Sequence, residues 1–321
     1  MAIVKHYTRT GCIISDTDKK MEYLYVGDYG KDQNIKADFL GYSKKINRVK
    51  HHDVDLKDKM VVTISTQKGC PMKCMFCDCP HVGFFGNVNR DELAEEVINA
   101  INISGCSYTE RFNLHLARMG EPSFNKDVLP FLEFDLPEIV KASMKADVIH
   151  PVYTTMLPKS NKKLKENILD FCRIKNEVYN GEAGLQFSIN STDEKQRDNL
   201  FRGKSLSLTE ISNLSKELPM PKGRKYTLNF PVTKETILDP AKLSELFDKN
   251  KFIVKITPIH ETNEARENGL ETEMGYYSYD VYEQFEKPLI AEGWDVIVFI
   301  PSIEEDEDRI TCGNALLADM K

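Results

Sequence analysis

From residue 60 onward, two kinds of hydrophobic pattern alternate along the chain. Short runs rich in β-branched and aromatic residues predict strands at 61–65, 112–117, 148–155, 184–189, 226–232, 252–259 and 294–300. Between them, apolar residues at helical spacing predict helices at 91–103, 126–142, 159–178, 241–248 and 277–292, with a further helix beginning near Thr192. This alternation predicts an α/β fold with a mostly parallel sheet and helical crossovers. About six such units are compatible with an open doubly wound sheet or with an incomplete barrel.

The first sixty residues do not share this pattern. Two short runs, 23–26 and 37–40, predict a small β meander added to one end. We therefore expect a small β-rich extension at 1–58 and one larger unit at 59–321.

Composition fits an ordinary globular chain of 321 residues, with 41% hydrophobic and 29% charged residues. No apolar run is long enough to cross a membrane, and the N-terminus lacks an apolar signal core, so we expect a cytoplasmic protein with no membrane partner. The net charge of −7 is unfavourable for general nucleic-acid binding.

Two local charge runs depart from this average. The basic stretch 44–52 is either a solvated loop or edge strand, or a phosphate-binding patch able to touch a small RNA. The acidic block 304–308 is expected to be hydrated and mobile, and to repel phosphate.

The cysteines point to metal chemistry, because four of the eight lie within ten residues. Cys70, Cys74 and Cys77 form a CxxxCxxC motif in a loop after the first strand of the alternating series. Three thiolates on one loop can hold three corners of a cubane iron–sulfur cluster and leave one iron open. Zinc is an alternative because Cys79 and His81 are nearby, although no second cysteine pair exists. A chance group of buried thiols is the other alternative.

This motif at the start of a strand–helix series resembles that of the radical S-adenosylmethionine (SAM) enzymes, and the aromatic Phe76 before the third cysteine also fits. The resemblance implies an incomplete (β/α)6 TIM-like barrel of the radical SAM type, with a C-terminal catalytic loop. It implies a [4Fe–4S] cluster on Cys70, Cys74 and Cys77, and SAM bound to the open iron. It also implies an external one-electron reductant such as flavodoxin or ferredoxin, with cleavage of SAM to methionine and a 5′-deoxyadenosyl radical.

Two further segments give a narrower resemblance, to the RlmN/Cfr group of methyl synthases, which act on adenine in RNA. The segment Met119-Gly120-Glu121-Pro122, followed by Asn125, resembles the element in which that group binds the methionine part of SAM. The segment that begins Cys312-Gly313-Asn314 resembles the group's C-terminal Cys-Gly-Gln-Leu. The resemblance implies that Gly120 and Glu121 bind SAM, and that Cys312 becomes methylated and carries the transferred carbon.

Weaker matches lie between these segments. Ser188 to Glu194 resembles the group's fourth-strand element, in which the matching serine contacts SAM, and this suggests SAM-binding roles for Ser188 and Asn190. Thr155 lies where the group has a Ser-Thr pair at the end of the third strand. Each of these is also an ordinary polar strand end.

The chain departs from the group in three ways. About sixty residues precede the cluster strand, where the RNA enzymes carry a larger RNA-binding domain. Thr63 stands where the group has a second cysteine that helps release the product by forming a disulfide with the carrier, so another thiol (Cys79 or Cys106) takes that role or release differs. The acidic block precedes Cys312, where it would raise the thiol pKa and disfavour RNA.

The sequence therefore predicts a radical SAM methyltransferase that consumes two SAM per turnover and methylates an sp2 carbon. The substrate is a small molecule, a nucleotide or a small RNA. A radical SAM enzyme that abstracts hydrogen directly, without methyl-cysteine, is the first alternative. A non-catalytic cluster-binding protein is the second.

Overall fold

The computed structural model describes residues 3–27, 55–301 and 303–319. The expected strand at 37–40 and the basic stretch 44–52 lie outside these residues. Within the described part, no helix is both long and apolar enough to span a membrane.

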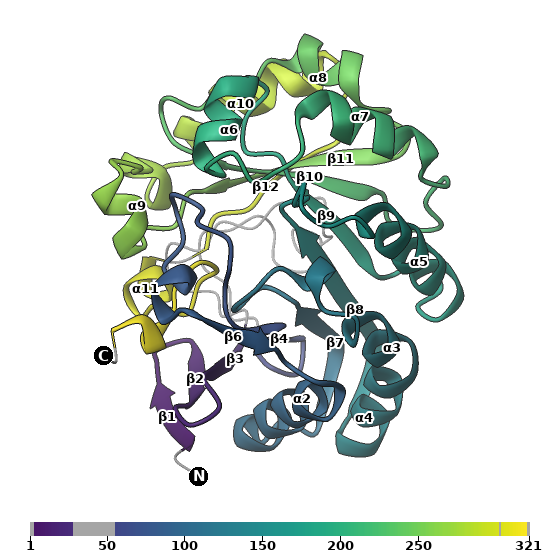
Figure 1. Ribbon diagram of the computed structural model, residues 1–321, viewed down its shortest axis with the longest axis vertical. Helices are drawn as coiled ribbons and strands as arrows, with labels where there is room; N and C mark the ends of the chain where they lie inside the picture. The colour runs from purple at the N-terminus through teal and green to yellow at the C-terminus, as the bar shows by residue number, and fades with distance from the viewer. Residues whose placement is uncertain (1–2, 28–54, 302, 320–321) are drawn as a thin grey trace.

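Ten strands form one sheet, and they follow an arc (Figure 1). In spatial order they are β1 (Ile3–Tyr7), β2 (Gly11–Asp16), β3 (Met21–Gly27), β4 (Lys59–Thr63), β7 (Tyr108–His115), β8 (Lys145–Thr155), β9 (Gly184–Ser188), β10 (Tyr226–Val232), β11 (Phe252–Pro258) and β12 (Val296–Val298). The first three strands pair antiparallel, with one another and with β4, whereas β4 to β12 pair in parallel. The parallel strands follow chain order without the reversal that defines a doubly wound sheet, so that alternative is wrong.

Helices lie outside the arc, as α2, α4, α5 and α7 show in Figure 1. The helices are α2 (Arg90–Ser104), α3 (Val128–Pro130), α4 (Leu136–Ser143), α5 (Leu164–Glu177), α6 (Glu194–Leu200), α7 (Leu208–Glu217), α8 (Pro240–Leu246), α9 (Asn263–Glu267), α10 (Asp280–Ala291) and α11 (Ile303–Glu307). Short 3-10 turns are η2 (Cys79–Val82), η3 (Pro122–Phe124), η5 (Glu273–Tyr276) and η6 (Leu316–Ala318), and η4 (Phe131–Asp135) is a π-helical turn.

Local sequence explains the first crossover helix. Asn89 caps α2 by accepting from the Glu92 amide, and the Glu92 carboxylate accepts from the Asn89 amide in return. Leu93 and Val97 are fully buried on the predicted apolar face. The segment predicted as a helix at 126–142 contains Pro130 and Pro137, and it is not one regular helix, because α3 passes through the π turn η4 into α4.

The sheet has two different faces. In β7, Phe112 and Leu114 are fully buried and belong to the main hydrophobic core, whereas Arg111, Asn113 and His115 line a cavity on the concave face. Strand periodicity therefore separates an apolar core under the helices from a polar interior at the centre of the arc. That interior positions the site described next.

Some expectations about the elements need correction. Strands β1 and β2 and helix α7 were not predicted, and β1 is mostly exposed, so its sequence carries no strong apolar signal. The three-cysteine motif does not follow the first parallel strand directly, because β5 (Gln67–Gly69) intervenes and pairs with β6 (Phe84–Asn87).

Candidate active site

The three motif cysteines lie on the loop between β5 and η2, and their thiols influence one another electrostatically. The nearby Cys77 raises the pKa of both other thiols, and Cys70 does the same for Cys74. Burial is the larger cause in both cases, and it raises the pKa of Cys70 to about 12 and that of Cys74 well above its ordinary value. Such a buried, mutually repelling group of sulfurs is stable as thiolates only when a metal centre neutralises it.

Backbone donors point at these sulfurs. The amides of Met72 and Gly120 donate to Cys70, and the Cys79 amide donates to Cys77. The Cys79 side chain also lies close enough to the Cys77 sulfur to interact with it, and this contact lowers the pKa of Cys77 and raises that of Cys79. Hydrogen bonds to cysteine sulfur are a normal feature of iron–sulfur sites, so the donor set fits a cluster.

The zinc alternative finds no support in the described residues. No three histidine, cysteine or carboxylate side chains there are grouped around a position for one metal ion. His81 instead pairs with Glu264 at 2.7 Å. A cubane cluster does not need a single-ion geometry, because each thiolate binds a different iron.

Gly120 and Glu121 lie beside the cluster loop at the end of β7. Gly120 has a φ of +95°, and a Cβ there would lie 2.5 Å from the side chain of Gln67, so this close approach requires glycine. The buried Glu121 carboxylate accepts from the amides of Ser123 (3.1 Å) and Met156 (2.9 Å). Burial raises its pKa. Glu121 thus joins the loop after β7 to the end of β8.

The other predicted cofactor residues occupy neighbouring strand ends. Thr155 is fully buried, donates to Glu121 and accepts from the Leu157 amide, so it supports Glu121. Ser188 ends β9 and is half-buried. Two residues later, Asn190 is 1% exposed with a φ of +63°, and neither polar atom of its side chain has a partner among the described residues. Buried amides are normally hydrogen-bonded, so the Asn190 side chain is available to bind a ligand or a water molecule.

Phe76 packs edge-on against Phe201 with ring centroids 5.7 Å apart. The Phe76 carbonyl accepts from the Thr262 hydroxyl at 3.2 Å. These contacts fix the loop between the second and third motif cysteines.

Cys312 joins this group from the far end of the chain. Its thiol donates to the Ala117 carbonyl at 3.2 Å, three residues before Gly120. The Gly313 carbonyl accepts from the Asp78 amide at 2.8 Å, so the C-terminal segment lies directly against the cluster loop. The thiol is accessible to solvent, yet the surrounding protein excludes enough water to raise its pKa to about 11, with a further increase caused by Cys77.

A buried ion pair holds this C-terminal segment in place. Arg118 and Glu22 are both fully buried, and Arg118 Nε donates to Glu22 at 2.7 Å. Arg118 also donates to the carbonyls of Arg309 (3.1 Å) and Thr311 (3.2 Å). Glu22 accepts from the amides of Leu316 and Leu317 at 3.2 and 3.1 Å. The pair therefore grips the chain on both sides of Cys312.

The acidic block before Cys312 is partly structural, contrary to expectation. Asp306 is 6% exposed and accepts from the Glu261 amide (2.9 Å) and the Thr311 hydroxyl (2.7 Å), and His260 lies 3.3 Å away. Burial acts to raise its pKa, but hydrogen bonding and charge from His260 outweigh burial and lower it to about 2. Asp308 pairs with Arg9 at 2.7 Å. No member of the block is among the causes of the raised Cys312 pKa.

Of the two candidate replacements for the missing family cysteine, only Cys79 lies near Cys312. The Cys79 thiol donates to the Arg118 carbonyl at 3.1 Å and lies 4.0 Å from the Gly313 carbonyl. Cys106 precedes β7 and donates to the Tyr108 carbonyl, at the opposite end of that strand. An eight-residue strand separates the two ends by roughly 25 Å.

The sequence analysis missed Glu22, Arg118 and the polar face of β7. No local sequence pattern indicates Glu22 or Arg118, because the two residues are 96 positions apart in the chain. The face was readable, because Arg111, Asn113 and His115 alternate with apolar residues, whereas a central parallel strand is usually apolar throughout.

Comparison with known proteins is consistent with this geometry. No protein-family model matches the chain. A probable dual-specificity RNA methyltransferase RlmN of Pseudothermotoga lettingae is 25% identical over 256 residues, which cover 78% of this chain and 64% of that protein. The RlmN of Nautilia profundicola is 26% identical over 196 residues, covering 58% of this chain and 51% of its own length. The chain thus spans about half to two thirds of these relatives.

Among solved structures, a radical SAM methyltransferase from Sphaerobacter thermophilus has a TM-score of 0.65 and 17% identity, over 98% of this chain and 81% of that one. The fold is therefore that of a radical SAM protein. In sequence, the chain is similar to the RlmN methyltransferases, and this similarity agrees with the fold.

The grip on the C-terminal segment can be tested by replacing Glu22. Glu22→Gln leaves Arg118 buried without its counter-charge, so we expect the free energy of unfolding in urea to fall by about 3–5 kcal/mol. Glu138→Gln is the matched control, because Glu138 forms an exposed pair with Lys141 at 4.0 Å and should change stability by less than about 1 kcal/mol. Equal effects of the two substitutions would show that the buried pair does not hold the fold together.

Asp306 predicts a pH dependence of stability. Its pKa in the folded protein, about 2, is below the ordinary value of 3.8, so the ionised form stabilises the fold above pH 4 and this contribution is lost as the pH falls toward 2. The shift corresponds to about 2 kcal/mol. We expect Asp306→Asn to lower the unfolding free energy by about that amount at pH 6, and the gap from the unsubstituted protein to narrow below pH 4. A gap that stays constant from pH 6 to pH 3 would contradict this assignment.

Proposed function

We propose that the protein is a radical SAM methyltransferase that delivers a methyl-derived carbon to an sp2 carbon through methylated Cys312. The observation that carries the proposal is the position of that thiol. The chain brings Cys312 against the cluster loop and the end of β7, although these segments are some two hundred residues apart in sequence. A structural thiol would not need to be accessible at this position, whereas a carrier does.

The proposal includes the incomplete (β/α)6 barrel of the superfamily, formed by β4 to β12 and their helices. The arc of parallel strands in chain order supports it. In this interpretation residues 1–58 are an extension, residues 59–321 form the partial barrel, and the segment around Cys312 is its catalytic loop.

The residues present fit both cofactors. Cys70, Cys74 and Cys77 would hold a [4Fe–4S] cluster, and Gly120, Glu121, Ser188 and Asn190 lie at adjoining strand ends where SAM would be bound. Thr155 would act through Glu121, and Phe76 would fix the loop. When reduced by an external donor such as flavodoxin or ferredoxin, the cluster supplies the electron that cleaves SAM to a radical.

The protein's own task is to prepare Cys312. The thiol must lose its proton to attack the methyl group of a first SAM, which forms a carbon–sulfur bond and releases S-adenosylhomocysteine. Burial opposes this deprotonation, whereas Arg118, Lys255 and the Gly313 amide all favour the thiolate. A second SAM is then consumed in activating the methyl group for transfer.

The names of the sequence relatives refer to RNA methylation. We propose a nucleobase-like acceptor for this chain too, in a nucleotide, a small RNA or another small substrate.

A second candidate function follows from the Cys312 pKa of about 11, which disfavours a thiolate at neutral pH. In that case the protein would abstract hydrogen directly from its substrate, and Cys312 would not be methylated.

Loss of one motif cysteine should abolish cluster binding. After anaerobic reconstitution, we expect Cys74→Ala to lose most of its iron and acid-labile sulfide and the electron paramagnetic resonance signal of the reduced cluster. Cys106→Ala is the matched control, since its thiol lies at the other end of β7 and should leave all three measurements unchanged. Full iron and sulfide in Cys74→Ala would refute the ligand assignment.

Peptide mass spectrometry tests the methyl-carrier role. After reconstitution and exposure to SAM and reductant, the Cys312 peptide should carry one additional methyl group, and the label should be absent in Cys312→Ala. Formation of 5′-deoxyadenosine with an unmodified Cys312 would instead favour direct hydrogen abstraction. Absence of both products would favour a non-catalytic protein.

A further inference from the structure

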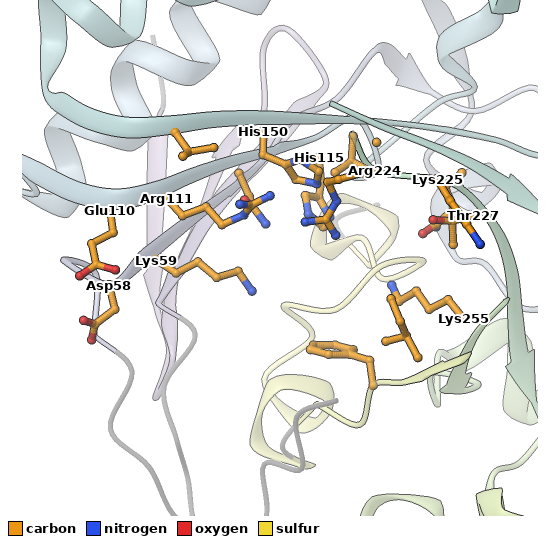
Figure 2. A pocket seen from close by; sticks show the side chains of 17 residues that line it. Asp58, Lys59, Glu110, Arg111, His115, His150, Arg224, Lys225, Thr227 and Lys255 are labelled. Carbon is orange, nitrogen blue, oxygen red and sulfur yellow. The ribbon is translucent and has the colours of Figure 1, made fainter. Parts of the chain in front are cut away.

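A cavity of about 350 Å³ lies on the concave face of the sheet (Figure 2). Its walls come from β4, β7, β8, β9, β10, β11 and β12. We call it the cationic cavity after its basic lining residues, which are Lys59, Arg111, His115, His150, Arg224, Lys225 and Lys255. Asp58 and Glu110 are the acidic lining residues, and Figure 2 shows them together at one side.

The charge of this cavity is opposite to that of the chain, which has a net charge of −7. Figure 2 shows the nitrogen ends of Arg111, Arg224 and Lys255 turned toward the interior. Acids neutralise part of the lining, since Arg111 pairs with Glu182 at 3.4 Å and Lys225 pairs with Asp295 at 2.7 Å. Concentrating like charges within a sheet interior costs free energy, and a bound anion would offset that cost.

His150 lies among these cationic groups. It is 5% exposed, and its ring contacts the Glu182 carbonyl. Burial lowers its pKa well below the ordinary value, and Arg224, Arg111 and His115 lower it further. Three basic residues from different parts of the cavity wall therefore lie within electrostatic range of the His150 ring.

One polar atom in the cavity wall has no hydrogen-bond partner among the described residues. Asn113 is 7% exposed and lines the wall between Arg111 and His115, and its Oδ1 atom makes no hydrogen bond to any described residue. Buried amides are normally satisfied, so this one is available to a ligand. The oxygen and nitrogen of an amide can exchange places by rotation, so Asn113 can present either a donor or an acceptor.

The cavity adjoins the proposed carrier thiol. The Cys312 thiol donates to the Ala117 carbonyl at 3.2 Å, and Ala117 lies two residues beyond the lining residue His115. The lining residue Lys255 is in register with Asn229, which in turn pairs with Ser188 at the end of β9. A ligand in the cavity would thus lie next to both Cys312 and the proposed SAM-binding strand ends.

We propose that the cationic cavity binds the phosphate of a mononucleotide-sized substrate and directs its base toward Cys312. Arginine and lysine groups converging from several strands suit the tetrahedral, multiply charged phosphate better than a single carboxylate. The volume is near the lower limit of about 300–1,000 Å³ for ligand pockets, which suits one nucleotide rather than a folded RNA. The orientation of the base rests on the proposed function, whereas phosphate binding does not.

Isothermal titration calorimetry on the reconstituted protein tests the proposal. The probes are the four ribonucleoside 5′-monophosphates, the four matching nucleosides and inorganic pyrophosphate. We expect at least one monophosphate to bind about tenfold or more tightly than its nucleoside, and pyrophosphate to compete with it, because a charge-assisted phosphate contact contributes about 1.5–3 kcal/mol.

Two cavity variants and one control identify the binding site. Arg111→Met and Lys255→Met should each raise the Kd of that monophosphate by about tenfold or more. Lys287→Met should leave it unchanged, because Lys287 is an exposed residue on α10 that pairs with Glu283. Thermal unfolding of each variant establishes that it is folded. If one of the two cavity variants does not fold, the other is used for the test.

The proposal is overturned if no monophosphate binds, if nucleosides bind equally well, or if the cavity variants match Lys287→Met. Tighter binding of a short RNA oligonucleotide than of every mononucleotide would also overturn it. Failure of the methyl-carrier mechanism is distinguishable, because Cys312→Ala should still bind the monophosphate. In that case the cavity is a phosphate site in a protein with a different reaction.

Discussion

The buried ion pair between Glu22 and Arg118 is the constraint on which the site depends. Two ions taken out of water are stable only when their remaining hydrogen-bonding positions are also filled. Here several positions are filled by the backbone on either side of Cys312, through carbonyls of residues 309 and 311 and amides of residues 316 and 317, while Arg118 Nη2 forms only the ion pair with Glu22 among the described residues. Through these hydrogen bonds, the buried pair connects an N-terminal strand, the end of β7 and the C-terminal segment.

Acidic and basic residues are distributed differently around the site. Acids fix the segments that approach Cys312, with Asp78 accepting from the Glu264 amide at 2.9 Å and from Arg309 at 3.1 Å, and Asp306 holding Thr311. Basic residues, in contrast, gather inside the arc of strands. An overall acidic protein therefore presents a locally positive interior, and net charge alone is a poor guide to the ligand.

The sequence predicted the repeating part of the fold well, because that part depends on local periodicity. Strand β10 has the predicted bounds, Tyr226–Val232. Strand β1 was missed since its residues are mostly exposed, and α7 since it closely follows α6 across a short loop. The cysteine spacing and the resemblance to a known group indicated the motif residues, and the structure brings them to one place. The Glu22–Arg118 pair could not be predicted, because only the tertiary fold brings the two side chains together.

The position of Thr63 explains how the chain can lack the second cysteine that the RlmN/Cfr group has there. Thr63 is in register with His115, so it lies on the sheet beside the cationic cavity, whereas Cys79 lies on the cluster loop beside Gly313. Under the proposed mechanism, a thiol that resolves the covalent intermediate must reach Cys312, and the distance along β7 excludes Cys106. A thiol that releases the covalent intermediate would therefore be Cys79, on the cluster loop. The concave face of the sheet would then serve to bind substrate. A threonine at position 63 places no reactive sulfur beside the lining residue His115, which is consistent with a cavity that binds substrate without taking part in redox chemistry.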